Sequence, residues 1–290
     1  MGGCNQNRDR GGRAFGVLTA ARLLAAMGLA VLAACAGSPL DSRSDLELTW
    51  ERALVLWPGE ASGKPQTARL EEAAFARWAE NQRDRRWPVV VYLHGCTGYG
   101  NFEFFERLAS EGYVVVAPDS FARRFRPLQC DPKTRTGGYN LFVYDFRHAE
   151  AAYAVQRLSE AAWADPRNFF LMGASEGGAA AALYRGDEFR ARVITQWTCT
   201  GRTNVRGLAG PLDTPVLAIV QARDPWYDPR RAPNQRGHCG DYMGDRPGSR
   251  SIVLERDSHT VDPDREVHDV YDDPATVETI LEFVAANRRS

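Results

Sequence analysis

The sequence predicts an α/β protein in which a mostly parallel sheet is covered by helices on both faces. From residue 88 onward, short apolar runs rich in β-branched residues alternate with amphipathic stretches. Strands that form unbroken apolar runs are buried on both faces, which is typical of parallel sheets joined by helices. A third observation is a serine between two glycines, at the junction of an apolar run and an alanine-rich stretch.

The elements are expected in this order along the chain. The expected strands are Pro88–Leu93, Tyr113–Ala117, Phe169–Met172, Arg192–Trp197, Pro215–Gln221 and Arg250–Leu254. The expected helices are Phe102–Ser110, Tyr144–Trp163, Gly178–Tyr184 and Pro274–Ala286. Ahead of them, alternation in Glu47–Trp57 predicts an entry strand, and the apolar spacing in Thr67–Gln82 predicts a helix.

Two longer irregular stretches, Ser120–Tyr139 and Asp224–Ser249, each follow an expected strand. The carboxyl ends of parallel strands meet at one edge of a sheet, where sites form, so we expect both stretches to cap that edge. No internal repeat or second domain is evident, and residues 47–290 are expected to form one domain.

Composition excludes several classes of function. Lys and Arg number 36 against 37 for Asp and Glu, so the chain lacks the charge of a nucleic-acid-binding protein. The cysteines lie far apart without a C-x-x-C pair, and no phosphate-binding glycine loop is present. We therefore expect no metal, no cofactor and no nucleic-acid partner.

The first 35 residues have the pattern of a signal segment. Four arginines precede the apolar run Leu23–Ala34, which is too short for a membrane span. The run ends in Leu-Ala-Ala-Cys35, which resembles a bacterial lipobox. That resemblance implies a lipid on Cys35, a tether over residues 36–46 and, with Ala36 next, the periplasmic face of the outer membrane. Ordinary cleavage is the alternative, because Ala34-Cys35-Ala36 also fits A-x-A.

The sequence Gly173-Ala-Ser-Glu-Gly177 fits G-x-S-x-G. A serine at a sharp turn from strand to helix needs small neighbours two residues away on each side, which the two glycines supply. We expect Ser175 to be a nucleophile exposed above the sheet. The alternative is a tight Gly-Ser turn that has no catalytic role.

A serine nucleophile requires a base and an orienting acid, which follow it in the order acid, then histidine. Asp224 follows the strand Pro215–Gln221, and His259 follows the strand Arg250–Leu254, so both are placed just beyond strand ends. The rival acid is Asp228 and the rival base is His268. Three further residues are expected outside the triad, namely His148 on a helix, His238 in the cap and Asp213 before its strand.

An oxyanion hole is expected from two backbone N–H groups. His94-Gly95-Cys96 follows the strand Pro88–Leu93, and Gly95 permits a tight turn that directs the Cys96 N–H toward the serine. The Glu176 N–H, after the nucleophile, is the second donor. His94 is expected to bond the loop backbone, and a plain turn is the alternative for the motif.

These residues together resemble an α/β-hydrolase, and more narrowly a dienelactone-hydrolase-like one, over about Pro88 to Val284. The resemblance rests on His94-Gly-Cys96, Asp119-Ser-Phe121, the Arg147 helix, Gly173–Gly177, Thr198-Cys199, Arg223-Asp224 and Ser258-His259, with Cys130 and Cys239. The founding members use a cysteine nucleophile, whereas this chain has Ser175. The resemblance therefore implies an α/β-hydrolase fold and ester chemistry rather than the cyclic-lactone substrate.

The leading hypothesis is a serine hydrolase that cleaves a small-molecule carboxylic ester (or lactone) through an acyl-enzyme, using Ser175, Asp224 and His259. The alternatives are a serine peptidase on the same fold and a non-catalytic binding lipoprotein of the envelope. The lipid on Cys35 would be the contact with the membrane. The cap arginines and Lys133 have two interpretations, a site for a substrate anion or solvated loop charge paired with Asp131, Asp228 and Asp241. These arginines are Arg123, Arg124, Arg126, Arg135, Arg223, Arg230, Arg231 and Arg236.

Four cysteines remain after the signal segment, and they allow three pairings. Cys96 and Cys130 follow consecutive strands, and Cys199 and Cys239 follow another consecutive pair. The loops after such strands emerge at one edge of the sheet, so we predict the disulfides Cys96–Cys130 and Cys199–Cys239. Four free thiols are the alternative.

Overall fold

The centre of the protein is a sheet, which lies in the compact unit Ser44–Ser290. The computed structural model describes residues 43–290 apart from 60–62, 83, 101, 127–129, 132, 135, 138–141, 202–204, 228–236 and 256–268. The strands of the sheet are β1 (Leu54–Trp57), β2 (Gln66–Arg69), β3 (Trp87–Leu93), β4 (Val114–Ala117), β7 (Ala164–Ala174), β8 (Ala191–Thr195), β9 (Val216–Gln221) and β10 (Arg250–Leu254).

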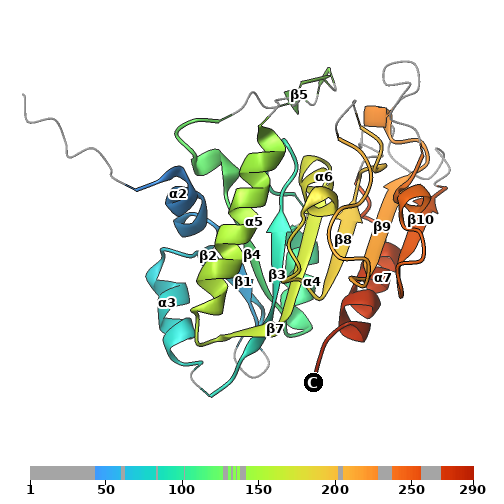
Figure 1. The fold of residues 1–290 in the computed structure, drawn as a ribbon. Helices are drawn as coiled ribbons and strands as arrows, with labels where there is room; N and C mark the ends of the chain where they lie inside the picture. The colour runs from blue at the N-terminus through green and yellow to red at the C-terminus, as the bar shows by residue number, and fades with distance from the viewer. Residues whose placement is uncertain are drawn as a thin grey trace, which may run out of the picture. The chain divides into compact units, whose positions relative to one another are not determined.

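The strand order across this eight-stranded sheet is β10-β9-β8-β7-β3-β4-β1-β2 (Figure 1). From β4 to β10 every neighbouring pair is parallel, and only β1 runs against the other strands. The carboxyl ends of the parallel strands therefore meet at one edge. The expected mostly parallel sheet is confirmed.

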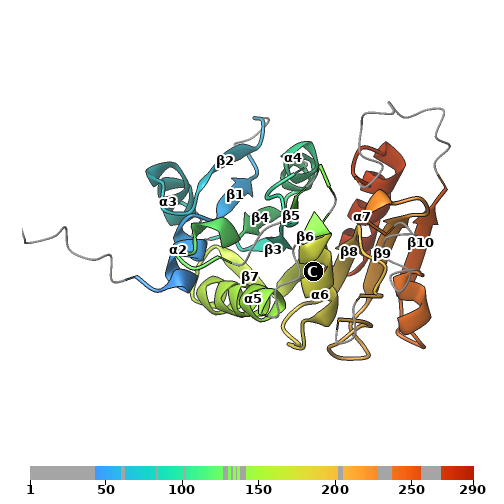
Figure 2. The same cartoon turned by 90° about the horizontal axis from the view of Figure 1, so that it is seen from above.

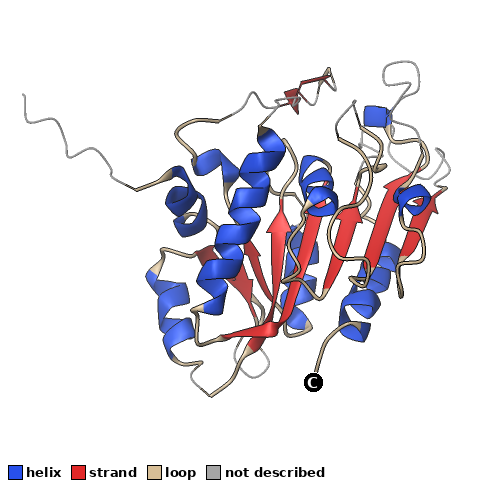
Figure 3. Ribbon diagram, in the orientation of Figure 1, coloured by secondary structure: helices blue, strands red, loops and turns tan. Residues whose placement is uncertain are grey.

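Helices cover both faces of the sheet (Figures 2 and 3). They are α2 (Asp45–Glu51), α3 (Ala73–Glu80), α4 (Phe102–Ser110), α5 (Val143–Ser159), α6 (Glu176–Leu183) and α7 (Pro274–Ala286). Figure 2 shows α4 and α7 on one face and α5 and α6 on the other. None of the helices in the described part of the chain has the length and hydropathy of a membrane span.

The apolar runs form strands because both of their faces are buried. All seven residues of β3 are buried. Val90 and Tyr92 pack with α4 and α7 in one core cluster, whereas Val89 and Val91 pack with α5 and α6 in another. Successive side chains of a strand point to opposite faces, so one continuous apolar run serves two cores.

The predicted entry strand over Glu47–Trp57 is wrong in its first half, which forms α2. Ser44 and Glu47 form a capping box, in which the Glu47 N–H donates to the Ser44 hydroxyl at 3.2 Å and the Glu47 carboxylate accepts from the Ser44 N–H. This reciprocal pair satisfies two backbone donors and starts a helix. Only the second half of the stretch forms a strand, β1, which the antiparallel neighbours β2 and β4 hold in the sheet.

The predicted helix over Thr67–Gln82 is also too long. Its first residues belong to the edge strand β2, which pairs with β1. The helix α3 begins only at Ala73, and Phe75 and Trp78 on its apolar face pack around Trp57. The N–H of Leu70 donates to the Ala53 carbonyl at 3.0 Å, so this residue extends the hydrogen bonding beside β2 and does not join the helix.

Other boundaries shift in smaller ways. The strand before Ser175 is longer than predicted, since β7 begins at Ala164, and α5 ends at Ser159 rather than Trp163. The cap stretches contain three short 3-10 helices and a small hairpin: η1 (Ser120–Ala122), β5 (Cys130–Asp131), β6 (Thr136–Gly137), η2 (Pro225–Tyr227) and η3 (Cys239–Tyr242).

Candidate active site

Ser175 lies at a sharp turn between β7 and α6, with φ 55° and ψ −116°. A non-glycine residue with positive φ is strained, and such residues cluster at functional sites. Two hydrogen bonds hold the turn, because the Ser175 N–H donates to the Thr195 carbonyl at 3.0 Å and its carbonyl accepts from Ala179 at 2.9 Å. The geometry is that of a nucleophile elbow, in which the serine stands at the carboxyl end of a central strand.

The two glycines of the motif are required by close backbone contacts. A Cβ atom on Gly173 would lie 2.1 Å from the Gly177 carbonyl oxygen. A Cβ on Gly177 would lie 1.9 Å from the carbonyl oxygen of Leu93. The elbow therefore packs against itself and against the end of β3, in agreement with the reasoning from the sequence.

The expected oxyanion loop follows β3 and faces the serine. A Cβ atom on Gly95 would lie 3.6 Å from the Cβ of Ser175, which brings the loop beside the elbow. As the first residue of α6, Glu176 has no intrahelical acceptor for its N–H. Among hydrogen bonds between described residues, none uses the backbone N–H of Cys96 or of Glu176.

Asp224 is buried three residues beyond the end of β9. Its Oδ1 accepts from the Trp226 N–H at 2.9 Å, and its own N–H donates to the Gln221 carbonyl at 3.3 Å. These bonds fix the carboxylate at the edge of the sheet that carries Ser175. The rival Asp228 lies outside the described residues.

His259 and its rival His268 also lie outside the described residues. The structure does describe residues before and after them. Before them, β10 ends at Leu254 on the carboxyl edge of the sheet. After them, the Asp269 carboxylate accepts from the Gln196 side chain at 3.2 Å, just beyond β8. The Tyr271 hydroxyl bonds Thr195 at 2.8 Å, next to the elbow.

The remaining histidines have structural partners. Burial lowers the pKa of His148, whose Nε2 lies 3.0 Å from the Ala180 carbonyl and joins α5 to α6. His238 caps η3, since its Nδ1 accepts from the Gly240 N–H at 3.0 Å. The sequence analysis placed both histidines outside the triad, and these contacts give each of them a structural role.

Both predicted disulfides are confirmed. Cys96 and Cys130 are bonded, with 5.7 Å between their Cα atoms, and Cys199 and Cys239 are bonded, with 4.7 Å between theirs. The first joins the oxyanion loop to the β5–β6 hairpin. The second joins the loop after β8 to η3. Each holds part of the cap at the carboxyl edge of the sheet.

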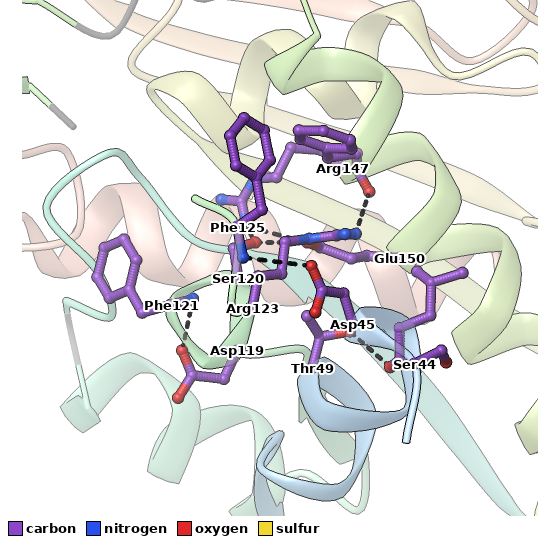
Figure 4. A network of polar contacts seen from close by, with 12 residues as sticks. Ser44, Asp45, Thr49, Asp119, Ser120, Phe121, Arg123, Phe125, Arg147 and Glu150 are labelled. Atoms are coloured by element: carbon purple, nitrogen blue, oxygen red, sulfur yellow. Dashed lines mark hydrogen bonds and ion pairs between the residues drawn. The ribbon is translucent and has the colours of Figure 1, made fainter. Parts of the chain in front are cut away.

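The sequence did not reveal a buried polar network around Glu150 (Figure 4), which hydrogen bonds to His94 connect to the oxyanion loop. Arg123, which we grouped with the cap arginines, is buried and forms an ion pair of 2.7 Å with Glu150 of α5. Arg147, one turn earlier on α5, also contacts Glu150, at 3.3 Å. The feature of the sequence that corresponds to this network is Glu150, which follows Arg147 by three residues on a helix that covers the sheet. Arg124 and Arg126 are exposed.

Three aromatic side chains at the carboxyl edge of the sheet, Phe121, Trp197 and Tyr227, are packed, buried or hydrogen-bonded. Phe121 packs on the ring of His94, with 4.9 Å between ring centroids, and Trp197 is buried. The Tyr227 hydroxyl donates to the Gln196 carbonyl at 2.7 Å. Within the described ranges, no cluster of His, Cys, Asp or Glu could hold a metal ion.

The strand order and the serine elbow define an α/β-hydrolase. Residues 74–228 match the model of the dienelactone hydrolase family, which is more than half of the 290 residues. The chain therefore belongs to the dienelactone hydrolase family. No curated protein matches it.

Solved structures of other proteins are similar in fold. A candidate dienelactone hydrolase of Klebsiella pneumoniae is 19% identical, with a TM-score of 0.48 over 80% of this chain and 98% of that one. An acetyl xylan esterase of Paenibacillus sp. R4 is 12% identical, with a TM-score of 0.48 over 86% of each chain. A phospholipase/carboxylesterase of Dyadobacter fermentans is 15% identical, with a TM-score of 0.44 over 70% of this chain and 92% of that one.

Proposed function

We propose that this chain is a serine hydrolase that cleaves small-molecule carboxylic esters through an acyl-enzyme on Ser175. The observation that carries the proposal is the strained backbone of Ser175 between β7 and the N-terminus of α6. Membership of the dienelactone hydrolase family supports hydrolysis of an acyl–oxygen bond. The serine, in place of the cysteine of the founding members, favours general esters over the cyclic lactone.

In the proposed mechanism, the Ser175 hydroxyl attacks the ester carbonyl carbon and His259 accepts its proton. Asp224 accepts a hydrogen bond from the imidazole and stabilises its charged form. The N–H groups of Cys96 and Glu176 donate to the oxyanion of the tetrahedral intermediate. The intermediate then expels the alcohol, which takes the proton from His259, and water releases the acid from Ser175 by the same steps.

The envelope location belongs to the same proposal. The lipobox-like residues before Cys35 favour a lipid anchor, and residues 36–43, ahead of α2, would separate that anchor from the hydrolase domain. One acyl chain binds a membrane weakly, whereas the several chains of a lipoprotein N-terminus anchor it stably.

The proposal is tested with Ser175→Ala and, as a matched control, Ser159→Ala at the exposed end of α5. We expect Ser175→Ala to lose fluorophosphonate labelling and at least about 10⁴-fold in ester turnover, with a residual rate from the oxyanion hole. Ser159→Ala is expected to keep both. The substrate panel combines esters of graded acyl length with aminoacyl anilides.

Each outcome of the panel decides between the functional classes. Turnover of esters alone supports the proposal, and faster turnover of the anilides indicates a peptidase. An absence of both turnover and labelling indicates a binding protein that has retained the fold. Near wild-type turnover by Ser175→Ala rejects the mechanism.

A further inference from the structure

The Gly95–Cys96 peptide of the oxyanion loop is fixed by hydrogen bonds to its carbonyl. The N–H of Cys96 and the carbonyl of Gly95 belong to the same rigid peptide plane, so whatever fixes the carbonyl also aims the N–H. The Gly95 carbonyl accepts from the Gly98 N–H at 3.1 Å and lies 2.8 Å from Nδ1 of His94. Hydrogen bonds to a carbonyl also polarise its peptide, which makes the N–H on the other side a better donor.

The His94 ring is itself fixed in one protonation state. The ring is 1% exposed, and its Nε2 accepts from the Ser120 N–H at 3.2 Å. Nη1 of Arg147 lies 3.3 Å from the same nitrogen. Because Nε2 faces two donors, the ring proton sits on Nδ1, where it points at the Gly95 carbonyl. Burial and the charge of Arg147 hold the pKa of His94 well below its usual range, so the ring stays neutral.

Arg147 connects this ring to both halves of the expected oxyanion hole. Its side chain is 1% exposed, and its Nη2 donates to the His94 carbonyl, one peptide before the Gly95 carbonyl. Its Nε lies 3.7 Å from the carboxylate of Glu176, the residue whose N–H is the second donor. One planar guanidinium thus contacts Glu176, which presents one of the N–H groups, and His94, whose ring bonds the peptide that presents the other.

The charge of Arg147 is balanced beneath the site. Nη1 lies 3.3 Å from Glu150, which is also 1% exposed and pairs with Arg123. Nη1 also donates to the Ser120 hydroxyl, and Ser120 in turn donates to Glu150. Figure 4 shows Arg147, Ser120, Arg123 and Glu150 as a connected group between α5 and the η1 loop. Buried charges that are paired and hydrogen-bonded are rigid supports for a site.

We propose that His94 and Arg147 are positioning residues that set the oxyanion hole, and this inference rests on the proposed serine hydrolase function. His94 orients the Gly95–Cys96 peptide, and Arg147 fixes the His94 ring after β3 and Glu176 at the start of α6 relative to each other. Neither side chain reacts. Donors of an oxyanion hole act only when they are preorganised toward the transition state, so a small rotation of that peptide lowers kcat and leaves substrate binding nearly unchanged.

The test uses two conservative variants of His94 that differ in where they place a donor. In His94→Asn, the amide nitrogen stands near the position of Nδ1 and still reaches the Gly95 carbonyl. In His94→Gln, the amide extends toward the position of Nε2 and leaves that carbonyl. We expect His94→Asn to keep kcat within about fivefold and His94→Gln to lose about 10- to 100-fold, with KM changed less than about threefold in both.

Arg147→Lys is the third variant, since it keeps a positive charge beside Glu150 but cannot contact His94 and Glu176 together. We expect its kcat to fall about tenfold. Affinity for a trifluoromethyl ketone, whose adduct on serine carries an oxyanion, should weaken in step with kcat across all three variants. Thermal unfolding is measured in parallel, to show that each variant remains folded at the assay temperature.

The results separate this inference from the proposed function. If wild-type protein neither hydrolyses esters nor reacts with fluorophosphonate, the proposed function fails and the inference fails with it. If the wild type is active, equal kcat in His94→Asn and His94→Gln overturns the role of His94. A loss that appears in KM rather than kcat, or ketone affinity that does not follow kcat, overturns the assignment to the oxyanion hole.

Discussion

Gly177→Ala is the substitution whose effect the structure defines most sharply. A Cβ at this position would lie 1.9 Å from the Leu93 carbonyl oxygen and 2.7 Å from that of His94. A Cβ atom ordinarily comes no closer than about 3.4 Å to such atoms, so α6 and the end of β3 would have to separate by roughly 1.5 Å. Both neighbours are backbone atoms, and neither can turn aside as a flexible side chain would.

Separation of α6 from β3 should lower both stability and activity. Overpacking of a rigid core destabilises by about 1–3 kcal/mol, and the backbone contact here places Gly177→Ala near the upper value. For a domain of this size, about 3 kcal/mol corresponds to a fall of roughly 6–12 °C in Tm. The same shift moves Ser175 relative to the oxyanion loop, and a misplacement of about 1 Å lowers kcat by about 100-fold.

The assay compares Gly177→Ala with Gly100→Ala, whose added Cβ meets nothing within 4 Å. Urea unfolding and Tm give the stability, and hydrolysis of the best ester in the panel gives kcat. Gly100→Ala is expected to stay within about 0.5 kcal/mol of wild type. Wild-type Tm and kcat in Gly177→Ala would refute the tight packing of the elbow against β3 and, with it, the placement of the oxyanion loop.

Three other predictions address separate features. Reduction should remove about 4 kcal/mol of stability for each disulfide, because the bridges close loops across 34 and 40 residues. Opening of Cys96–Cys130 should also lower ester turnover before the domain unfolds, and unchanged turnover after reduction would contradict this. Between pH 7 and 5.5, the unfolding free energy of the wild type should fall by about 1 kcal/mol more than that of His94→Asn. The reason is that burial lowers the pKa of His94 in the folded state, so below about pH 6.5 only the unfolded state protonates this ring. Unfolding free energies that change equally with pH in the two proteins would exclude this linkage. Cys35→Ser should release the protein from membranes, as measured by detergent partitioning and mass spectrometry of the N-terminus, and a soluble wild type beginning after the signal segment would select ordinary cleavage.

The sheet was predictable because a strand that is buried on both faces is an unbroken apolar run in the sequence. Every residue of β3 is apolar or proline, and such a run has no face that could meet water. The disulfides followed from the same topology, since Cys96 and Cys130 come after consecutive parallel strands that open at one edge. The pairing of adjacent strands therefore favoured these two disulfides over the other pairings.

The N-terminal part was less predictable because local patterns competed there. The alternation in Glu47–Trp57 fits a strand, but the capping box at Ser44 contributes hydrogen bonds that favour a helix first. In Thr67–Gln82, the helical spacing is real for α3, and pairing with β1 removes its first residues. In both cases the boundary was set by a contact, the capping box or the strand pairing, that the spacing of apolar side chains does not show.

The support of the oxyanion hole could not be read from the sequence, because it depends on contacts between distant segments. His94 follows β3, Ser120 begins η1 and Arg147 lies on α5, and nothing in the spacing of these residues indicates that they meet. An arginine and a glutamate three residues apart on a helix usually form a solvated pair on its surface. Here α5 turns both side chains toward the end of β3, where each is 1% exposed. A charged pair buried directly behind the expected oxyanion peptide stabilises the fold little compared with apolar residues of equal volume, so its value lies in the geometry that it imposes on that peptide.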